Sequence, residues 1–244
     1  MNPHRMEGQF EWAGSRILRT TVIPSKRRVI DNEDVLIPTD LREWITPAES
    51  QEIRRVVASL DMPHSKEAGD FDNRTRSVWK YVAEHITYRS DAVSQRRADF
   101  WQFPAETLAL RAGDCEDCAF LLATLLLAAG ISPFCVRVVF GTLTRQDGST
   151  VGHAWPIYRA EKGSWMVLES TLDLDSFPKH WQLADDLARQ DATSRYYPDI
   201  CLNQQHVWAI GRRCRIQNAA SYLYSKGWLR NPYPTKRTPA KKAR

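Results

Sequence analysis

Hydrophobic positions in the first half of the chain follow two different periods. Residues 15–45 contain short β-branched runs interrupted by prolines, which indicates short strands and turns. Residues 47–60 and 72–86 instead carry apolar side chains three or four positions apart, which predicts two amphipathic helices. We expect Asp72 or Asn73 to cap the second of these helices.

The longest nearly continuous apolar run covers residues 119–129 and is followed by Gly130. Such a run predicts a buried helix that the glycine closes in the left-handed conformation. Cys115 would then lie in the first turn of this helix. Downstream, β-prone runs separated by glycines predict an antiparallel meander over residues 135–140, 153–159 and 165–168. The fold class is therefore α+β, with a central helix packed on an antiparallel sheet.

The remaining segments complete the expected domain organisation. Residues 180–195 predict a polar helix, and residues 207–210 predict a strand that returns to the sheet. We expect three parts. Residues 1–70 form an N-terminal extension, made of strands and a helix, that packs on the core, and residues 71–215 form a central domain with the buried helix. Residues 216–244 form a C-terminal extension with a disordered basic tail.

Composition narrows the classes of partner. The chain has 244 residues, 43% of them hydrophobic, which is enough for the core of one substantial domain. The net charge is +5, but residues 236–244 carry five basic side chains and no acidic one. The rest of the chain is therefore neutral, so we expect no nucleic-acid partner and interpret the basic end as a solvated tail.

The cysteines and the N-terminus favour a reducing compartment. Five scattered cysteines do not resemble the disulfide framework of a small secreted protein. Residues 1–12 lack the apolar run of a secretory signal, and no stretch reaches the roughly 18 apolar residues of a membrane span. We expect a cytoplasmic protein with no membrane attachment. Cys115 and Cys118 spell C-x-x-C, but no second pair completes a four-ligand zinc site.

Cys115 has the surroundings that a nucleophilic cysteine requires. Unpaired N–H groups at a helix N-terminus stabilise a thiolate. The neighbouring carboxylates of Asp114 and Glu116 act in the opposite direction, so a cationic partner is needed. His153 lies in a strand-like segment that could run beside the start of the helix, although a lone histidine there could equally be a core residue.

A base of this kind needs an acidic partner on its second ring nitrogen. Glu169 follows the β-prone run 165–168 and is suitably placed if that strand pairs with the strand of His153. Asp173 is the alternative acid.

Three sequence strings in the same order resemble the core of the transglutaminase-like superfamily, which is a papain-related group of cysteine enzymes. They are GDCEDCAFLLATLLLAAGI at 113–131, GHAW at 152–155 and WMVLEST at 165–171. A fourth string, DFWQFPAETL at 99–108, resembles the segment that precedes the nucleophile in bacterial transglutaminase-like cysteine proteinases. The resemblance covers residues 70–175.

The resemblance implies a papain/transglutaminase-like core and makes residues 71–215 its catalytic domain. It assigns Cys115 as nucleophile, His153 as base and Glu169 as orienting acid. The superfamily more often has Asp as its acid, so the reach to His153 differs by one methylene. Cys118 stands where the superfamily more often has an apolar residue, so we expect a packed thiol, with a resolving or disulfide-forming role as the alternative.

Two further roles follow from the resemblance and remain alternatives. A Trp or Gln of the upstream segment often completes the oxyanion hole in this superfamily, which makes Trp101 and Gln102 candidates beside the backbone N–H of Cys115. Trp101 could equally be a core residue.

Acidic residues surround the nucleophile in the string GDCED. In periplasmic proteinases with this string, such carboxylates bind calcium, so Asp114, Glu116 and Asp117 are candidate calcium ligands. Helix capping explains Asp114 and Asp117 without a metal. We favour capping, because a calcium site needs more oxygen ligands than these three residues provide. We therefore expect no cofactor.

The sequence thus predicts a cysteine-dependent hydrolase of amide bonds in peptides or isopeptides, acting through a thioester acyl-enzyme with a Cys-His-Glu triad. Its partner would be a peptide or protein substrate. One alternative is a transglutaminase or acyltransferase that passes the acyl group to an amine. The other is a binding module that has kept the fold without catalysis.

Overall fold

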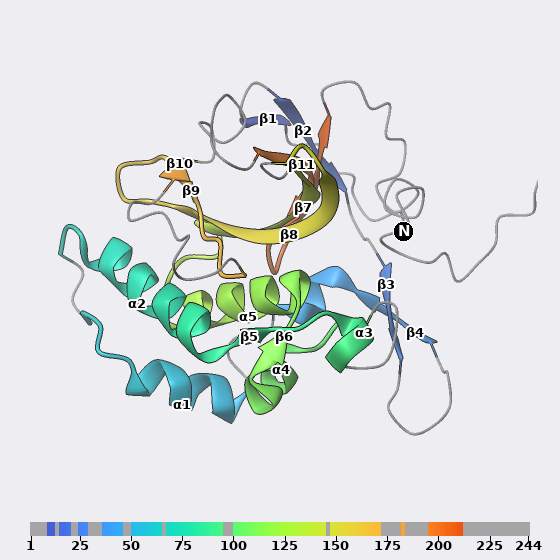
Figure 1. Ribbon diagram of the computed structural model, residues 1–244. Coiled ribbons are helices and arrows are strands. Elements are labelled where there is room, and N and C mark those ends of the chain that lie inside the picture. Colours follow the sequence, from blue (N-terminus) through green and yellow to red (C-terminus); the bar gives the residue numbers. More distant parts are fainter. Residues whose placement is uncertain are drawn as a thin grey trace, which may run out of the picture.

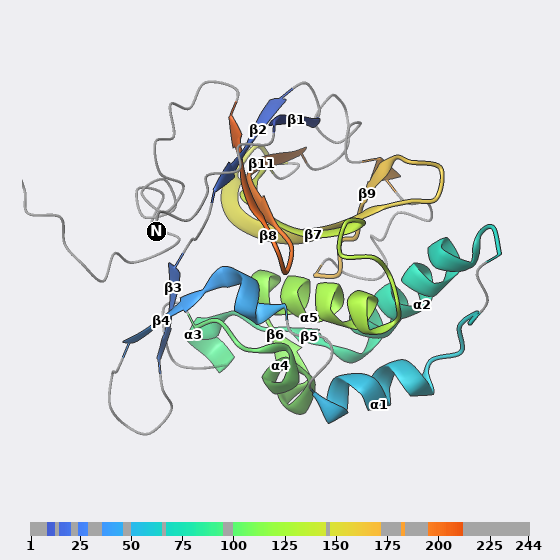
Figure 2. The ribbon, with the colours of Figure 1, turned by 180° about the vertical axis from the view of Figure 1, so that it is seen from behind.

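The computed structural model describes residues 9–12, 15–20, 24–28, 36–45, 50–64, 67–94, 100–144, 147–171, 182–183 and 195–211. In this part of the chain a large antiparallel sheet lies on a group of helices (Figure 1), and the view from behind shows the same two layers (Figure 2). The helices are the 3-10 helix η1 (Leu41–Trp44) and the α-helices α1 (Gln51–Ser59), α2 (Asp70–His85), α3 (Asp91–Ser94), α4 (Pro104–Leu110) and α5 (Cys115–Ala128).

The main sheet has eight strands in the order β1-β2-β12-β11-β7-β8-β9-β10. Its strands are β1 (Gln9–Trp12), β2 (Ser15–Thr20), β7 (Val136–Thr144), β8 (Thr150–Arg159), β9 (Trp165–Val167), β10 (Gln182–Leu183), β11 (Arg195–Leu202) and β12 (Val207–Gly211). Two small sheets pair β3 (Pro24–Arg28) with β4 (Leu36–Asp40) and β5 (Thr87–Tyr88) with β6 (Ala112–Gly113). The expected α+β class, with a helix on an antiparallel sheet, is confirmed.

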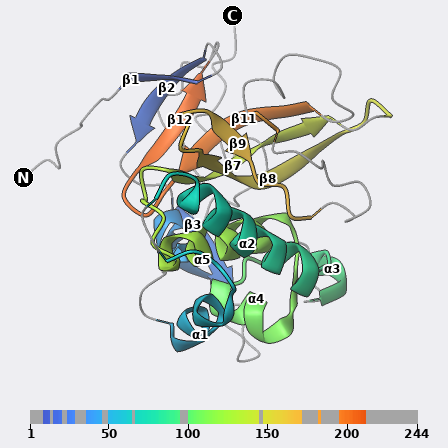
Figure 3. The same cartoon turned by 90° about the vertical axis from the view of Figure 1, so that its left-hand side faces the viewer.

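Helix α5 is the centre of the molecule. It contacts β7 and β8 on one side and α1, α2 and α4 on others, and Figures 1 and 3 place α1 and α4 on the side away from the sheet. Every residue from Glu116 to Leu126 is buried, as expected for a helix that is apolar on all sides. Gly130 follows with a left-handed φ of 86°. The predicted buried helix and its glycine closure are therefore correct.

The two amphipathic helices begin at residues other than those expected. Helix α1 starts after Ser50, whose side chain accepts a hydrogen bond from the Ile53 N–H at 3.4 Å. Helix α2 starts after Gly69, and not after Asp72 or Asn73.

The reason for the early start of α2 is a cap supplied from another part of the chain. The carboxylate of Glu161, in the turn after β8, accepts hydrogen bonds from the N–H groups of Gly69 and Phe71. It satisfies donors at the helix N-terminus that a local side chain would otherwise have to satisfy. Asp72 instead accepts a hydrogen bond from the Tyr158 hydroxyl at 2.9 Å.

Close contact between strands fixes the register of the sheet next to α5. Strands β7 and β8 pair along their whole length, with Gly141 opposite His153. On the other edge of β7, β11 approaches so closely that a Cβ atom at Gly141 would lie 2.1 Å from the carbonyl oxygen of Tyr197. Only glycine fits this position.

The sheet carries apolar side chains on both faces. One set belongs to the core around α5 and includes Phe140, Ala154 and Ile200. A second cluster contains Trp155 and Tyr196, together with Val139, Leu143, Ile157, Cys201 and Trp208.

Residues 180–195 were expected to be a helix, and this prediction is wrong at β10, where residues 182–183 pair with β9. Most of the remaining positions of that segment lie outside the described residues. The strand expected at 207–210 is β12. Within the described ranges, no helix is long and apolar enough to cross a membrane. The proposed tail lies outside the described residues, and the division into three parts stays a prediction.

Candidate active site

Cys115 occupies the first position of α5, directly after the N-cap residue Asp114. The chain reaches this position through β6, which is held by Arg89 N–H donating to the Gly113 carbonyl at 2.9 Å. A Cβ atom at Gly113 would lie 2.6 Å from Cβ of Asp117, so the absence of a side chain lets the loop lie against the first turn of the helix. The thiol is thus carried by a rigid loop-to-helix junction.

The thiol of Cys115 is partly buried and is protonated at rest. It donates a hydrogen bond to Oε2 of Glu116 at 3.1 Å. Burial raises the pKa of the Cys115 thiol well above its ordinary value, and the charges of Glu116 and Asp114 raise it further. The backbone N–H of Ala154, which hydrogen-bonds the sulfur, lowers it. The N-terminus of α5 therefore does not by itself make a stable thiolate, and ionisation needs a base.

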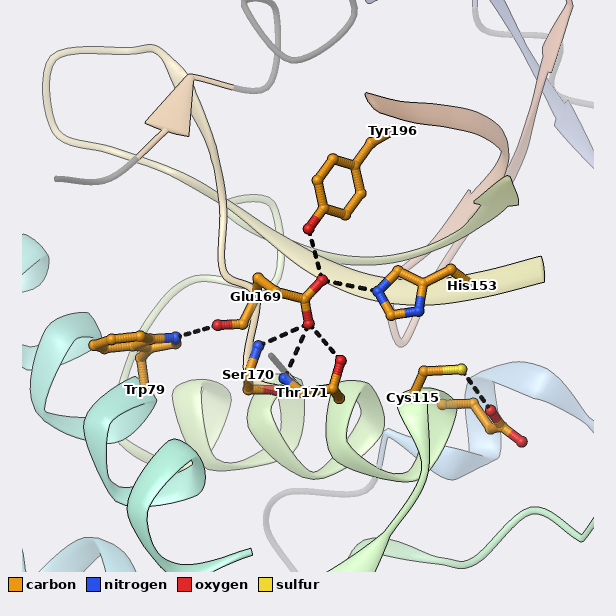
Figure 4. Close-up of polar contacts among 8 residues, drawn as sticks. Trp79, Cys115, His153, Glu169, Ser170, Thr171 and Tyr196 are labelled. Atoms are coloured by element: carbon orange, nitrogen blue, oxygen red, sulfur yellow. Dashed lines mark hydrogen bonds and ion pairs between the residues drawn. The ribbon is translucent and has the colours of Figure 1, made fainter. Parts of the chain in front are cut away.

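Ala154 follows His153 on β8, so its contact with the sulfur brings this strand beside Cys115. Figure 4 shows the His153 ring between Glu169 and Cys115, with one ring nitrogen toward the carboxylate and the other on the side of the nucleophile. The Nε2 atom of His153 lies 2.8 Å from Oε2 of Glu169, and both side chains are almost fully buried. The expected pairing between the strand of His153 and the strand before Glu169 is present as β8 and β9.

Glu169 lies just beyond the end of β9. The Leu168 N–H still bonds to the Pro156 carbonyl at 2.9 Å, so the chain continues alongside β8 until it presents the carboxylate to His153. Trp79 of α2 holds the same turn, because its indole N–H donates to the Glu169 carbonyl at 2.7 Å.

The Glu169 carboxylate accepts five hydrogen bonds. Oε1 accepts from the N–H of Ser170 and of Thr171, both at 3.0 Å, and from the Thr171 hydroxyl at 2.7 Å. Oε2 accepts from His153 and, at 2.8 Å, from the hydroxyl of Tyr196. Burial would raise the pKa of Glu169, but the charge and hydrogen bond of His153 and the Thr171 donors outweigh it and hold the pKa at about 2.

An ionised carboxylate can only accept hydrogen bonds, so Nε2 of His153 carries the proton that joins it to Glu169. In the neutral ring Nδ1 is then left as the acceptor on the side of Cys115. This arrangement can accept a proton from the thiol and stabilise the resulting imidazolium.

The two candidate oxyanion donors both lie in the core. Trp101 is buried and stacks on Phe140 with ring centroids 5.3 Å apart. Gln102 is fully buried, and its side-chain amide donates to Oδ2 of Asp117 and, at 3.4 Å, to the Ala112 carbonyl. Gln102 therefore supports the loop before the nucleophile, and an oxyanion role for either residue stays a prediction. The alternative acid Asp173 lies outside the described residues.

Cys118 is buried, and its sulfur lies 3.9 Å from the Gly113 carbonyl oxygen. Burial raises the pKa of the Cys118 thiol, followed by the charge of Asp117. These surroundings agree with the packed thiol that the sequence favours.

Carboxylates near the nucleophile form two groups that could supply metal ligands. Ligand atoms of Asp114, Cys115 and Glu116 lie within 4.8 Å of one another, as do those of Asp91, Asp114 and Asp117. The Asp117 carboxylate already accepts hydrogen bonds from the Gln102 N–H at 2.7 Å, from its amide, and from the Asp114 N–H at 3.3 Å. Burial raises the pKa of Asp117 to about 8, with the charge of Asp114 adding to it. Asp117 therefore ties the loop to the helix, as the capping hypothesis expects.

Three residues of the site were not identified from the sequence. Tyr196, Thr171 and Trp79 all contact Glu169. Thr171 lies inside the string WMVLEST and could have been found there as a donor next to the acid. Trp79 and Tyr196 are 90 and 27 residues from Glu169, and no local pattern marks them.

The fold and the site define a class of protein in which a cysteine opens a central helix and a histidine-carboxylate pair lies on the adjoining sheet. Residues 59–170 match the family model of the transglutaminase-like superfamily. Among curated proteins no sequence match is found.

Solved structures with a similar arrangement include calcium-bound LapG of Legionella pneumophila, with 17% identity and a TM-score of 0.45 over 72% of this chain and 85% of that chain. EGTA-treated LapG of the same organism gives the same identity and TM-score over 72% of this chain and 96% of that chain. A candidate cysteine protease from Cytophaga hutchinsonii has 14% identity and a TM-score of 0.36 over 81% of this chain and 70% of that chain.

Proposed function

We propose that this protein is a cysteine-dependent hydrolase of amide bonds in peptides or isopeptides, with Cys115 as nucleophile, His153 as base and Glu169 as the acid that orients it. The observation that carries the proposal is the 2.8 Å contact between Nε2 of His153 and Glu169, with the second ring nitrogen toward Cys115. A histidine that served only as a core residue would need neither a nearly buried ionised partner nor a neighbouring thiol.

The reaction begins when Nδ1 of His153 takes the thiol proton and the sulfur of Cys115 attacks the carbonyl carbon of the amide. The hydrogen bond from the thiol to Glu116 must break for this step. The imidazolium then gives its proton to the leaving amine as the C–N bond breaks, which leaves a thioester. Water, deprotonated by His153, attacks the thioester, and the released thiolate regains the proton. Glu169 stays ionised throughout and stabilises the imidazolium.

A glutamine-containing peptide incubated with and without a primary amine tests this proposal against the acyltransferase alternative. Hydrolysis predicts cleaved peptide fragments, or ammonia and a glutamate product from the glutamine side chain, in a yield that does not fall when the amine is added. An amine adduct that replaces the glutamate product would favour the transglutaminase reaction. Absence of both products, together with Cys115 reacting with iodoacetamide no faster than Cys135, would favour a binding module.

Glu169→Gln should lower kcat/KM by about 10- to 1,000-fold, which is less than loss of the nucleophile or base, because the acid supports His153 without reacting itself. Both carboxylate oxygens of Glu169 accept hydrogen bonds. In either orientation of the glutamine amide that replaces them, its NH2 group would face a hydrogen-bond donor. The variant should therefore also be less stable, and kcat/KM should be measured beside a thermal unfolding curve.

Glu161→Gln is the matched control for that loss of stability. This carboxylate also accepts N–H donors, but at the start of α2. We expect it to lower the melting temperature and leave kcat/KM unchanged. A larger loss of kcat/KM in Asp173→Asn than in Glu169→Gln would assign the acid to Asp173 instead.

Activity in EDTA should equal activity in millimolar calcium, because Asp117 already accepts hydrogen bonds from three N–H groups and a calcium site takes about six to eight oxygen ligands. A calcium ion would be held by Asp114 and Glu116. Its charge would stabilise these two carboxylates and the neighbouring Cys115 thiolate. Parallel assays in EDTA, calcium and magnesium check this expectation. Loss of activity in EDTA that calcium restores and magnesium does not would contradict it.

A further inference from the structure

Tyr196 reaches the site from a strand outside the segment that the family model covers. It lies on β11, on the opposite side of β7 from β8. Its hydroxyl donates at 2.8 Å to Oε2 of Glu169, which is the oxygen that also lies 2.8 Å from Nε2 of His153 (Figure 4). Two donors from different strands therefore meet on one carboxylate oxygen.

Aromatic contacts hold the phenol ring in this position. Tyr196 is buried and meets Trp155 edge to face, with ring centroids 5.0 Å apart. It also lies 6.0 Å from the His153 ring, which in turn stacks on Trp155 at 5.8 Å. A ring packed on both neighbours keeps its hydroxyl aimed at Glu169 with little loss of entropy when the hydrogen bond forms.

The sheet is shaped to allow this approach. Gly141 lies opposite His153 on β7, and a side chain there would collide with the Tyr197 carbonyl at 2.1 Å and with Trp155 at 2.6 Å. The register between β11 and β7 also shifts between Pro198 and Ile200. Gly141 and the irregular register together bring Tyr196 to the site.

Tyr196 is not needed to hold the Glu169 side chain in place. Ser170 and Thr171, which follow Glu169 directly, already provide three hydrogen bonds to Oε1. The contribution specific to Tyr196 falls on Oε2, the oxygen that faces His153. A donor at that oxygen withdraws negative charge from it and so weakens its stabilisation of an imidazolium.

We propose that Tyr196 is a positioning residue that acts through Glu169: its hydrogen bond to Oε2 limits how strongly this carboxylate stabilises the imidazolium form of His153. This inference rests on the proposed function for its catalytic meaning, but the coupling between the three side chains stands on the contacts alone. Among the described residues, the ionisable groups near the pair are Tyr196 from β11 and the thiols of Cys115 and Cys118 from α5, and the carboxylates of Asp114 and Glu116 lie next to the Cys115 thiol. Burial and the Glu169 charge raise the pKa of the Tyr196 phenol far above its ordinary value, so it remains a donor.

Tyr196→Phe tests the inference because it keeps the ring and removes only the hydroxyl. The pKa of His153 is to be measured by NMR titration of its ring resonances, identified by their absence in His153→Ala. We expect this pKa to rise by about 0.5 to 1 unit, since a less neutralised carboxylate favours the imidazolium. The acid limb of the kcat/KM profile should move by the same amount, and KM should stay unchanged.

Two matched tyrosines on the same chain serve as controls. Tyr197→Phe makes the same change one residue away, at a side chain that is 43% exposed. Tyr158→Phe removes another buried hydroxyl, one that donates to Asp72 at 2.9 Å. We expect Tyr158→Phe to lower the melting temperature about as much as Tyr196→Phe, and both controls to leave the His153 titration unchanged.

The outcomes separate this inference from the proposed function. A Tyr196→Phe variant that loses stability like Tyr158→Phe but leaves the pKa of His153 within about 0.2 units would overturn the positioning role. Because the titration requires no substrate, that result would leave the hydrolase proposal intact. A raised pKa of His153 in a protein with no Cys115-dependent turnover would support the coupling and reject the hydrolase.

Discussion

Cys115→Ala should abolish hydrolysis of a peptide amide, because Cys118, the other thiol at the start of α5, is buried and packed. The change removes one sulfur atom at the start of α5, together with its hydrogen bonds to Glu116 and Ala154. Net hydrogen bonds of this kind are worth about 1 kcal/mol, so the melting temperature should shift by only a few degrees. Product release measured beside thermal unfolding distinguishes a lost nucleophile from a lost fold.

Cys135→Ala is the matched control for this experiment. Cys135 is also partly buried, and it precedes β7 on a different part of the molecule. We expect this variant to retain full activity. Turnover by Cys115→Ala above the uncatalysed background, in protein that unfolds like the wild type, would show that the nucleophile is another residue.

The parts of the fold that the sequence predicts correctly are those whose signals are local. The apolar run at 119–129 has no polar face to expose, so it had to become the buried helix α5. Gly130 adopts the left-handed conformation that closes such helices. The position of Cys115 in the first turn follows from these two features and from Asp114 as its N-cap.

The sequence did not reveal contacts that depend on how distant elements meet. Glu161 caps α2 from a turn about 90 residues downstream, so the predicted local cap at Asp72 or Asn73 is wrong. Tyr196 reaches Glu169 only because of the strand order and the close approach at Gly141. Neither condition leaves a periodic pattern in the chain.

The electrostatics of the nucleophile also required the structure. From sequence, the helix N-terminus favours the thiolate and the adjacent carboxylates oppose it, which leaves the balance open. In the structure, burial raises the pKa of the Cys115 thiol and so adds to the effect of Glu116 and Asp114. The balance therefore favours the protonated thiol. In the proposed mechanism, ionisation of Cys115 therefore depends on proton transfer to His153.

His153→Gln should lower kcat/KM by about 10²- to 10⁴-fold, the range expected for loss of a general base. Glutamine tests the base more specifically than alanine does. Its amide N–H can replace Nε2 as a donor to Glu169, whereas no group of the side chain replaces Nδ1 as a base. His153→Ala would in addition leave the buried Glu169 carboxylate without one of its hydrogen-bond donors and so destabilise the protein. Similar losses of kcat/KM in both variants, with a smaller loss of stability in His153→Gln, would assign the effect to the base.

Alkylation by iodoacetamide, followed by mass spectrometry, tests the same role without a substrate. Burial and the charges of Glu116 and Asp114 raise the pKa of Cys115, whereas at Cys135 burial raises the pKa and Arg159 and Arg137 lower it. Without a base, Cys135 should therefore react faster. We expect Cys115 to react faster in the wild type because His153 takes its proton, and the order to reverse in His153→Gln. If Cys115 remains the faster thiol in that variant, its reactivity comes from a group other than His153.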